Sequence, residues 1–93
     1  MNPQLNAKLH ANRANINLKF KNYGKVIEDC KIAIKYSPDY LKAYYRMGKA
    51  LIALKRFQEC LDLLKEHKDG DLVGLRKEAE QHWAKEKVEI KKV

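Results

Sequence analysis

Two stretches of the sequence decide the fold: AKLHANRANINLKFKNYGKVIEDCKIAIKYSP at residues 7–38 and LKAYYRMGKALIALKRFQECLDLLKEHKDGDL at residues 41–72. A shift of 34 residues brings them into register and aligns Ala14 with Gly48 and Tyr23 with Phe57. Small residues at the first pair would let helices cross closely, and the aromatic pair would open the second helix of each unit. A repeat of this length with helical spacing predicts stacked helical hairpins.

Outward from these stretches, hydrophobic spacing predicts an all-α fold, because no window alternates as a strand would. Five helices are expected, at residues 3–20, 23–36, 39–54, 57–68 and 72–92. In the first helix, the expected apolar stripe consists of Leu5, Leu9, Ile16 and Phe20, supported by Ala7, Ala11 and Ala14.

Short breaks separate the expected helices. Lys21-Asn22 and Lys55-Arg56 are expected to form tight turns. In Asp69-Gly70-Asp71 we expect Gly70 to be left-handed and Asp71 to cap the last helix. The single tryptophan, Trp83, should be at least partly buried on that helix.

The charge is unevenly distributed. The 93 residues carry a net charge of +8, and all of the excess positive charge lies in the first 56 residues. Such a field favours an anionic partner, whether nucleic acid, acidic lipid or acidic peptide. The mean hydropathy is −0.65, and the absence of an 18-residue apolar run argues against a membrane span.

The residues that usually carry chemistry are sparse. Cys30 and Cys60 lie on apolar helical stripes, so we expect buried thiols in a reducing compartment, the cytoplasm or the nucleus. The three histidines, His10, His67 and His82, have no metal-ligand spacing. Without a nucleophile motif or a Gly-rich phosphate loop, we expect no enzyme activity, no cofactor and no metal.

A polar stripe recurs on the first helix of each expected hairpin. It comprises Lys8, Asn12, Asn15 and Lys19 on one helix and Lys42, Arg46 and Lys49 on the other. The stripe contains no Asp or Glu at i+4, the usual partner of a lysine on a merely solvated face. It therefore predicts a basic groove without a carboxylate, with a solvated lysine face as the alternative.

The repeat resembles the tetratricopeptide repeat: a small residue, then an aromatic with a small residue three positions on, then Ala33 and Pro38. The resemblance implies a right-handed superhelix of antiparallel hairpins. It divides the chain into repeats at 7–40 and 41–70 and a capping helix at 72–92.

Two short sequence segments make the resemblance to a particular class of these repeats more specific. LHANRA at residues 9–14 and KAYYR at residues 42–46 are similar to the dicarboxylate-clamp repeats of co-chaperones. Among these co-chaperones, the sequence most resembles the tetratricopeptide repeat protein four family. The resemblance implies binding to the acidic C-terminal tail of a ninety- or seventy-kilodalton heat-shock chaperone. The family's carboxylate-gripping residues correspond here to Asn12, Lys42 and Arg46, with Lys8, Asn15, Lys19, Tyr45 and Lys49 as secondary groove residues.

The chain departs from the family pattern in one respect. The family clamp draws on three repeats, and this sequence begins at what resembles the second. We therefore expect part of a longer protein, weak binding of isolated peptides and an exposed face at Leu5, Leu9 and Ile16. That face could also join a second copy into a homo-oligomer.

Two other functions are compatible with the sequence. Tyr36, Tyr40, Tyr44 and Tyr45 interleave with basic residues as in a nucleic-acid-binding surface, although no nucleic-acid motif is present. A generic scaffold for another acidic or hydrophobic peptide is the second alternative, and it would not require a free C-terminal carboxylate.

Overall fold

The periodic apolar positions fold into helices throughout the computed structural model, which describes residues 2–91. The five helices are α1 (Pro3–Lys19), α2 (Tyr23–Tyr36), α3 (Leu41–Ala53), α4 (Phe57–Leu64) and α5 (Gly70–Lys91). Residues 2–91 contain no strand, so the all-α prediction is confirmed. The expected end of the last helix at residue 92 lies outside the described residues.

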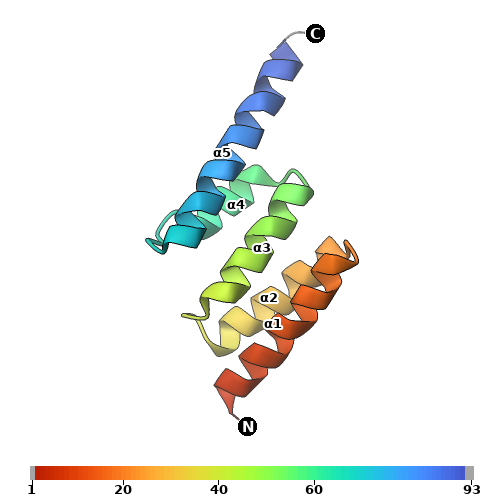
Figure 1. Ribbon diagram of the computed structural model, residues 1–93, viewed down its shortest axis with the longest axis vertical. Coiled ribbons are helices and arrows are strands. Elements are labelled where there is room, and N and C mark those ends of the chain that lie inside the picture. Colours follow the sequence, from red (N-terminus) through yellow and green to blue (C-terminus); the bar gives the residue numbers. More distant parts are fainter. Residues whose placement is uncertain (1, 92–93) are drawn as a thin grey trace.

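The helices form two antiparallel hairpins followed by a longer helix (Figure 1). α2 packs against both α1 and α3, and α3 also contacts α1, α4 and α5. This serial packing makes an elongated body with a longest extent of 53 Å. The C-terminal part of α5 projects beyond the other helices. None of the helices in residues 2–91 is long and apolar enough to cross a membrane.

The turns of the two hairpins are copies of each other. Lys21 and Lys55 both adopt the left-handed conformation, with φ of 61° and 60°. The amide of Asn22 donates to the Asn17 oxygen, and the amide of Arg56 donates to the Leu51 oxygen, each at 2.8 Å. This six-to-one bond around a left-handed residue is the Schellman motif that ends helices. The expected tight turns at both places are confirmed.

The break before α5 differs from the prediction. α4 ends at Leu64 rather than near residue 68, and α5 already begins at Gly70, which does not have a positive φ. Asp69, not Asp71, supplies the cap, because its Oδ1 accepts a hydrogen bond of 3.0 Å from the Asp71 amide. Because the capping carboxylate stands two residues earlier than expected, Gly70 falls inside the helix.

The core faces of α1 and α3 contain small residues. Ala7, Ala11 and Ala14 are fully buried, whereas Leu5, Leu9 and Ile16 of α1, and Phe20 just beyond its end, are 54–73% exposed. The expected stripe was therefore wrong in combining the two sets, because the alanine face allows α1 to approach its neighbours closely. The separate expectation of exposure at Leu5, Leu9 and Ile16 is confirmed.

Close approach also explains Gly48 on α3. A Cβ placed there would lie 2.6 Å from Leu75 Cδ2 on α5 and 3.5 Å from Leu64 Cδ1 on α4. Gly48 thus lets α3 contact the capping helix as well as its hairpin partner. Cys30 and Cys60 are buried and Trp83 is half-buried, as predicted.

Candidate functional site

A groove of about 520 Å³ lies between α1, α3 and the beginning of α5. Its walls bring together four of the predicted site residues with five others: Asn15, Leu18, Leu41, Lys42, Tyr45, Arg46, Asp69, Asp71 and Leu72. The helical spacing of Lys42, Tyr45 and Arg46 puts them on one face of α3. Groups of both charges and three leucine side chains therefore share one concave surface.

Arg46 connects two walls of this groove. Its Nη1 donates a hydrogen bond of 2.6 Å to the main-chain oxygen of Ala11, across from α3 to α1. The side chain is half-buried and also lines the groove. Because a guanidinium carries five N–H donors in one plane, this bond leaves others for a ligand. The structure thus presents an oriented cation in the groove.

Lys42 and Lys49 differ in how their charge is used. Lys42 lines the groove, is exposed, and takes part in none of the ion pairs within residues 2–91. Lys49 lies 3.6 Å from Glu78 Oε2 on α5, and its Nζ is 5.7 Å from the centre of the Tyr45 ring. A partner carboxylate neutralises much of the charge that Lys49 could offer to a ligand.

The prediction of a groove without carboxylates is wrong. Asp69 and Asp71 line the groove, and Glu78 pairs with Lys49. All three acids come from α5 or the loop before it, and the repeat register of α1 and α3 carries no information about that helix. The signal that could have revealed them is the acidic excess of residues 57–93.

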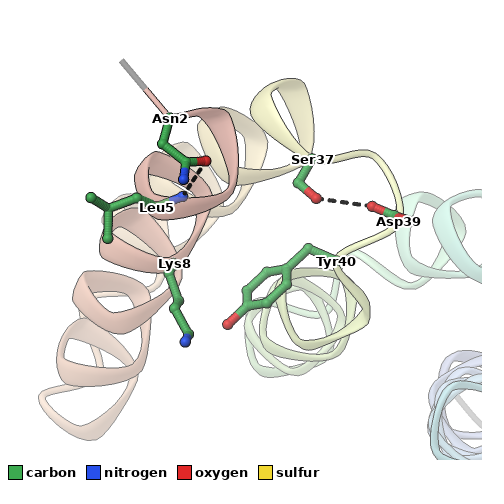
Figure 2. Close-up of a pocket in the computed structure, with 6 residues that line it drawn as sticks. All are labelled: Asn2, Leu5, Lys8, Ser37, Asp39 and Tyr40. Carbon is green, nitrogen blue, oxygen red and sulfur yellow. Dashed lines mark hydrogen bonds between the residues drawn. The ribbon is translucent and has the colours of Figure 1, made fainter.

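The remaining predicted residues lie outside this groove. Asn12 and Lys19 are exposed on α1 but do not line it. Lys8 lines a second pocket, of about 450 Å³, between α1 and the α2–α3 loop, together with Asn2, Leu5, Ser37, Asp39 and Tyr40. Figure 2 shows the Lys8 side chain extending from α1 toward the Tyr40 ring.

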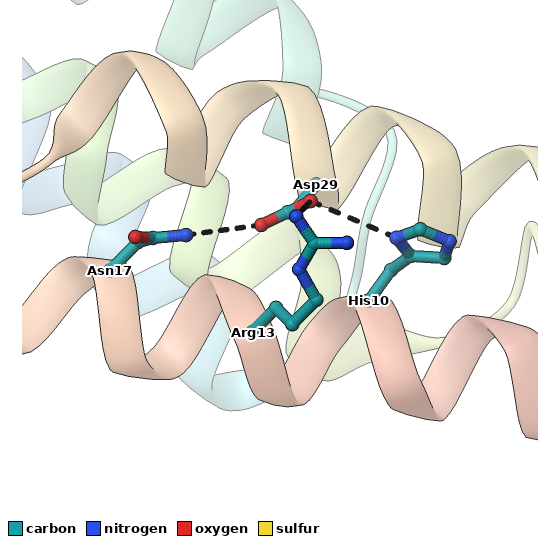
Figure 3. Close-up of polar contacts among 4 residues, drawn as sticks. All are labelled: His10, Arg13, Asn17 and Asp29. Carbon is teal, nitrogen blue, oxygen red and sulfur yellow. Dashed lines mark hydrogen bonds and ion pairs between the residues drawn. The ribbon is translucent and has the colours of Figure 1, made fainter.

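A buried carboxylate that the sequence analysis did not single out joins α1 to α2 (Figure 3). Asp29 is only 5% exposed, and its Oδ2 accepts a hydrogen bond of 3.1 Å from Asn17 Nδ2. Arg13 Nη2 and His10 Nδ1 lie 3.9 and 3.7 Å from Asp29 Oδ1. At that distance His10 Nδ1 forms no hydrogen bond, and it has no other partner. An acid among the apolar positions of α2, facing a helix without acids, is the signal that could have identified this contact.

Burial keeps the two cysteine thiols and the Tyr44 hydroxyl neutral. Burial raises the pKa of the Cys30 thiol to about 12 and that of the Cys60 thiol to about 11. Burial, together with nearby Asp39, also raises the pKa of Tyr44. The Tyr44 hydroxyl donates a hydrogen bond of 2.6 Å to the main-chain oxygen of Pro38. The centroids of the Tyr44 and His67 rings lie 4.3 Å apart. Tyr44 is thus engaged in packing rather than presented as a stacking platform.

No group of three or more His, Cys, Asp or Glu residues within the described part of the chain could hold a metal ion. The site therefore consists of a hydrogen-bonding and charged groove above a small-residue core.

Two antiparallel hairpins in a 34-residue register, with a capping helix and a groove on the first-helix side, define a tetratricopeptide-repeat domain. The solved structure of the Hsp90 co-chaperone Cns1 from Saccharomyces cerevisiae has the same fold. It matches 97% of this chain and 31% of its own length, with a TM-score of 0.88 and 27% identity.

The sequence relatives include an Hsp70/Hsp90 co-chaperone and a tetratricopeptide repeat protein. The Hsp70/Hsp90 co-chaperone cns1 of Schizosaccharomyces pombe is 40% identical over 77 residues, which is 77% of this chain. The tetratricopeptide repeat protein 4 homolog of Dictyostelium discoideum is 38% identical over 74 residues, 74% of this chain. The chain spans about a fifth of the length of these relatives, 22% and 19%. No family model matches it.

The chain belongs with the tetratricopeptide-repeat proteins of the Cns1 and tetratricopeptide repeat protein 4 type.

Proposed function

We propose that this chain is a protein-interaction module that binds the acidic C-terminal peptide of a ninety- or seventy-kilodalton heat-shock chaperone and catalyses no reaction. The observation that carries the proposal is that Lys42 and Arg46 line the same groove. Lys42 takes part in no ion pair among the described residues. The module comprises repeats at 7–40 and 41–70 and the capping helix that follows them.

The chemistry of the groove suits a terminal carboxylate. The guanidinium of Arg46 offers a planar fork, Lys42 offers a mobile ammonium, and Asn15 offers an amide donor. Each charge-assisted hydrogen bond contributes about 1.5–3 kcal/mol. Leu18 and Leu41 provide an apolar surface for a neighbouring side chain of the peptide.

The proposed carboxylate-binding residues are Asn12, Lys42 and Arg46. Asn12 lies outside the groove lining, so it would have to contact a peptide that extends along α1. With two strong contacts in the groove, we expect micromolar or weaker binding, about −8 kcal/mol or less in magnitude.

The relatives support the choice of partner. The relatives from Schizosaccharomyces pombe and Saccharomyces cerevisiae are named Hsp70/Hsp90 co-chaperones, and this chain matches a part of each. A chaperone partner would also place the protein in the cytoplasm or the nucleus.

Calorimetric titration with a peptide ending in Glu-Glu-Val-Asp, compared with its C-terminal amide, tests the proposal. Lys42→Ala and Arg46→Ala should each weaken binding of the free acid at least tenfold, given the strength of charge-assisted bonds. Lys25→Ala is the control, because Lys25 is exposed on α2 and its removal lowers the net charge equally. Wild-type affinity in both groove variants would show that the carboxylate is bound elsewhere.

The same titration, together with one using duplex DNA, distinguishes the peptide-binding function from the two alternatives. Equal binding of acid and amide would favour a scaffold for another acidic or hydrophobic segment. Binding of duplex DNA with a steep salt dependence, without binding of the peptide, would favour the nucleic-acid function.

A second proposal concerns the exposed apolar face formed by Leu5, Leu9 and Ile16 of α1 and by Phe20 just after it, which are 54–73% exposed. We propose that this face joins two copies of the chain. Because α1 contains no acidic residue, like charges oppose the association, which should strengthen as salt screens them. A monomer by light scattering at high protein and high salt concentration would contradict this proposal.

A further inference from the structure

The hydrogen bond from Arg46 to Ala11 is the only side-chain hydrogen bond that links α1 to α3 within residues 2–91. It spans 35 positions of the sequence and measures 2.6 Å. Its acceptor lies in the middle of α1, on a residue that is fully buried. The two helices that it joins form facing walls of the groove.

The contacts of α1 with its two neighbours differ in kind. Toward α2, α1 is held by the Asp29 cluster, in which Asn17, Arg13 and His10 converge on one carboxylate (Figure 3). Toward α3, Arg46 is the one polar side-chain attachment of α1 among the described residues, and the same side chain lines the groove. Ligand binding at Arg46 therefore acts on the contact between two walls.

We propose that Arg46, besides binding the peptide carboxylate, couples this binding to the docking of α1 on α3. This inference rests on the proposed peptide-binding function. The Ala11 oxygen holds one N–H of the guanidinium, which fixes the plane of the group and orients its other donors toward the groove. A carboxylate that accepts from those donors holds the guanidinium in place, and so it also strengthens the attachment of α1.

The coupling is reciprocal by thermodynamic linkage. A ligand that binds only when α1 is docked stabilises the docked state. Loss of the Ala11 contact therefore weakens the binding of the ligand. A lysine at position 46 keeps the charge but has a single nitrogen and no fixed plane. It cannot hold the Ala11 oxygen and orient a fork of donors at the same time.

Hydrogen exchange with and without the peptide ending in Glu-Glu-Val-Asp tests the coupling. In the wild type, saturating peptide should slow amide exchange in the middle of α1, around residues 9–15, as well as in α3. Exchange is the appropriate readout because it reports local opening of a helix rather than contact with the ligand. Peptide binding that leaves exchange in α1 unchanged would overturn the inference while leaving the proposed function intact.

Arg46→Lys is the diagnostic variant, and Arg56→Lys, the same change outside the groove, is its matched control. Arg46→Lys should bind the peptide about tenfold more weakly, with the salt dependence of binding unchanged because the charge is kept, and saturating peptide should no longer slow exchange in α1. Arg56→Lys, at an exposed arginine that does not line the groove, should keep both the affinity and the exchange effect. An Arg46→Lys protein with wild-type affinity and coupling would overturn the inference, and failure of the wild type to bind the peptide would overturn the proposed function as well.

Discussion

Lys21 and Lys55 occupy equivalent positions in successive hairpins, and both adopt a left-handed backbone with φ of 61° and 60°. Each ends the first helix of its hairpin and is followed by the same six-to-one hydrogen bond. Glycine favours this conformation, and a residue with a Cβ pays a cost there. The tight turns that set the repeat are thus formed by lysine.

Substituting Lys21→Gly should stabilise the protein by about 0.5–1 kcal/mol, because it removes the left-handed penalty. Lys55→Gly should increase the stability by less, because this change also removes the ion pair between Lys55 Nζ and Glu86 Oε1, which lie 2.8 Å apart. Urea unfolding measures both changes. Lys21→Ala keeps the Cβ and is the control, and an equal gain in that variant would contradict the explanation.

Replacing Gly48 by alanine should destabilise the protein. The new Cβ would lie 2.6 Å from Leu75 Cδ2, and overpacking of this kind costs about 1–3 kcal/mol. Gly74→Ala on α5 is the matched control. No atom lies within 4 Å of the position that its Cβ would take, so the gain in helix propensity, about 1 kcal/mol, should appear there. Comparable thermal stability in the two variants would show that Leu75 moves aside freely.

Removing the buried carboxylate with Asp29→Ala should cost about 1–3 kcal/mol, because Asn17 loses its acceptor and the α1–α2 contact loses its central charge. Arg13→Ala should cost less than 1 kcal/mol, since its side chain is 67% exposed. Glu28→Ala, at an exposed neighbouring position, serves as the control. Chemical denaturation distinguishes the three, and an Asp29→Ala protein as stable as the control would refute the role of this cluster.

Glu78→Gln should increase the affinity for an acidic peptide about two- to threefold, the range expected for releasing one exposed ion pair. Glu78 lies 3.6 Å from Lys49 and 3.8 Å from His82, so its neutralisation frees the charge of Lys49 at the edge of the groove. Glu80→Gln changes the net charge equally at an exposed position outside these pairs. The same gain in both variants would assign the effect to overall charge alone.

The protein should lose stability at alkaline pH through its two thiols. Their pKa values rise from 9.0 to about 12 for Cys30 and about 11 for Cys60, chiefly because burial disfavours the thiolate. In the unfolded protein the thiols ionise at a lower pH than in the folded protein. The stability that the buried, protonated thiols contribute is therefore complete below their ordinary pKa and is lost as the pH rises toward the folded pKa values.

Urea unfolding at about pH 7.5 and about pH 10.5 measures this effect as a difference between the two conditions. The variant Cys30→Ala/Cys60→Ala should lose less stability than the wild type over that interval, because its other titrating groups are unchanged. An equal loss would indicate that tyrosine and lysine side chains carry the alkaline sensitivity.

Much of the candidate site could be predicted from the residue types on α3. Lys42, Tyr45 and Arg46 fall on one face because helical spacing is local, and they do line one groove. Asn12 shares the polar stripe of α1 with Asn15, yet only Asn15 reaches the groove. The crossing of α1 and α3 decides which turn of a helix faces its neighbour, and spacing within a single helix carries no information about that crossing.

The sequence by itself determined the number of helices, the register of 34 residues between the hairpins and the basic character of the first half, because each follows from local periodicity and composition. Only the tertiary structure decided that the alanine face of α1 is the buried one, that α5 brings acids to the groove, and that Arg46 holds the Ala11 oxygen. These features depend on which surfaces can approach closely, and that depends on the shapes of two helices at once.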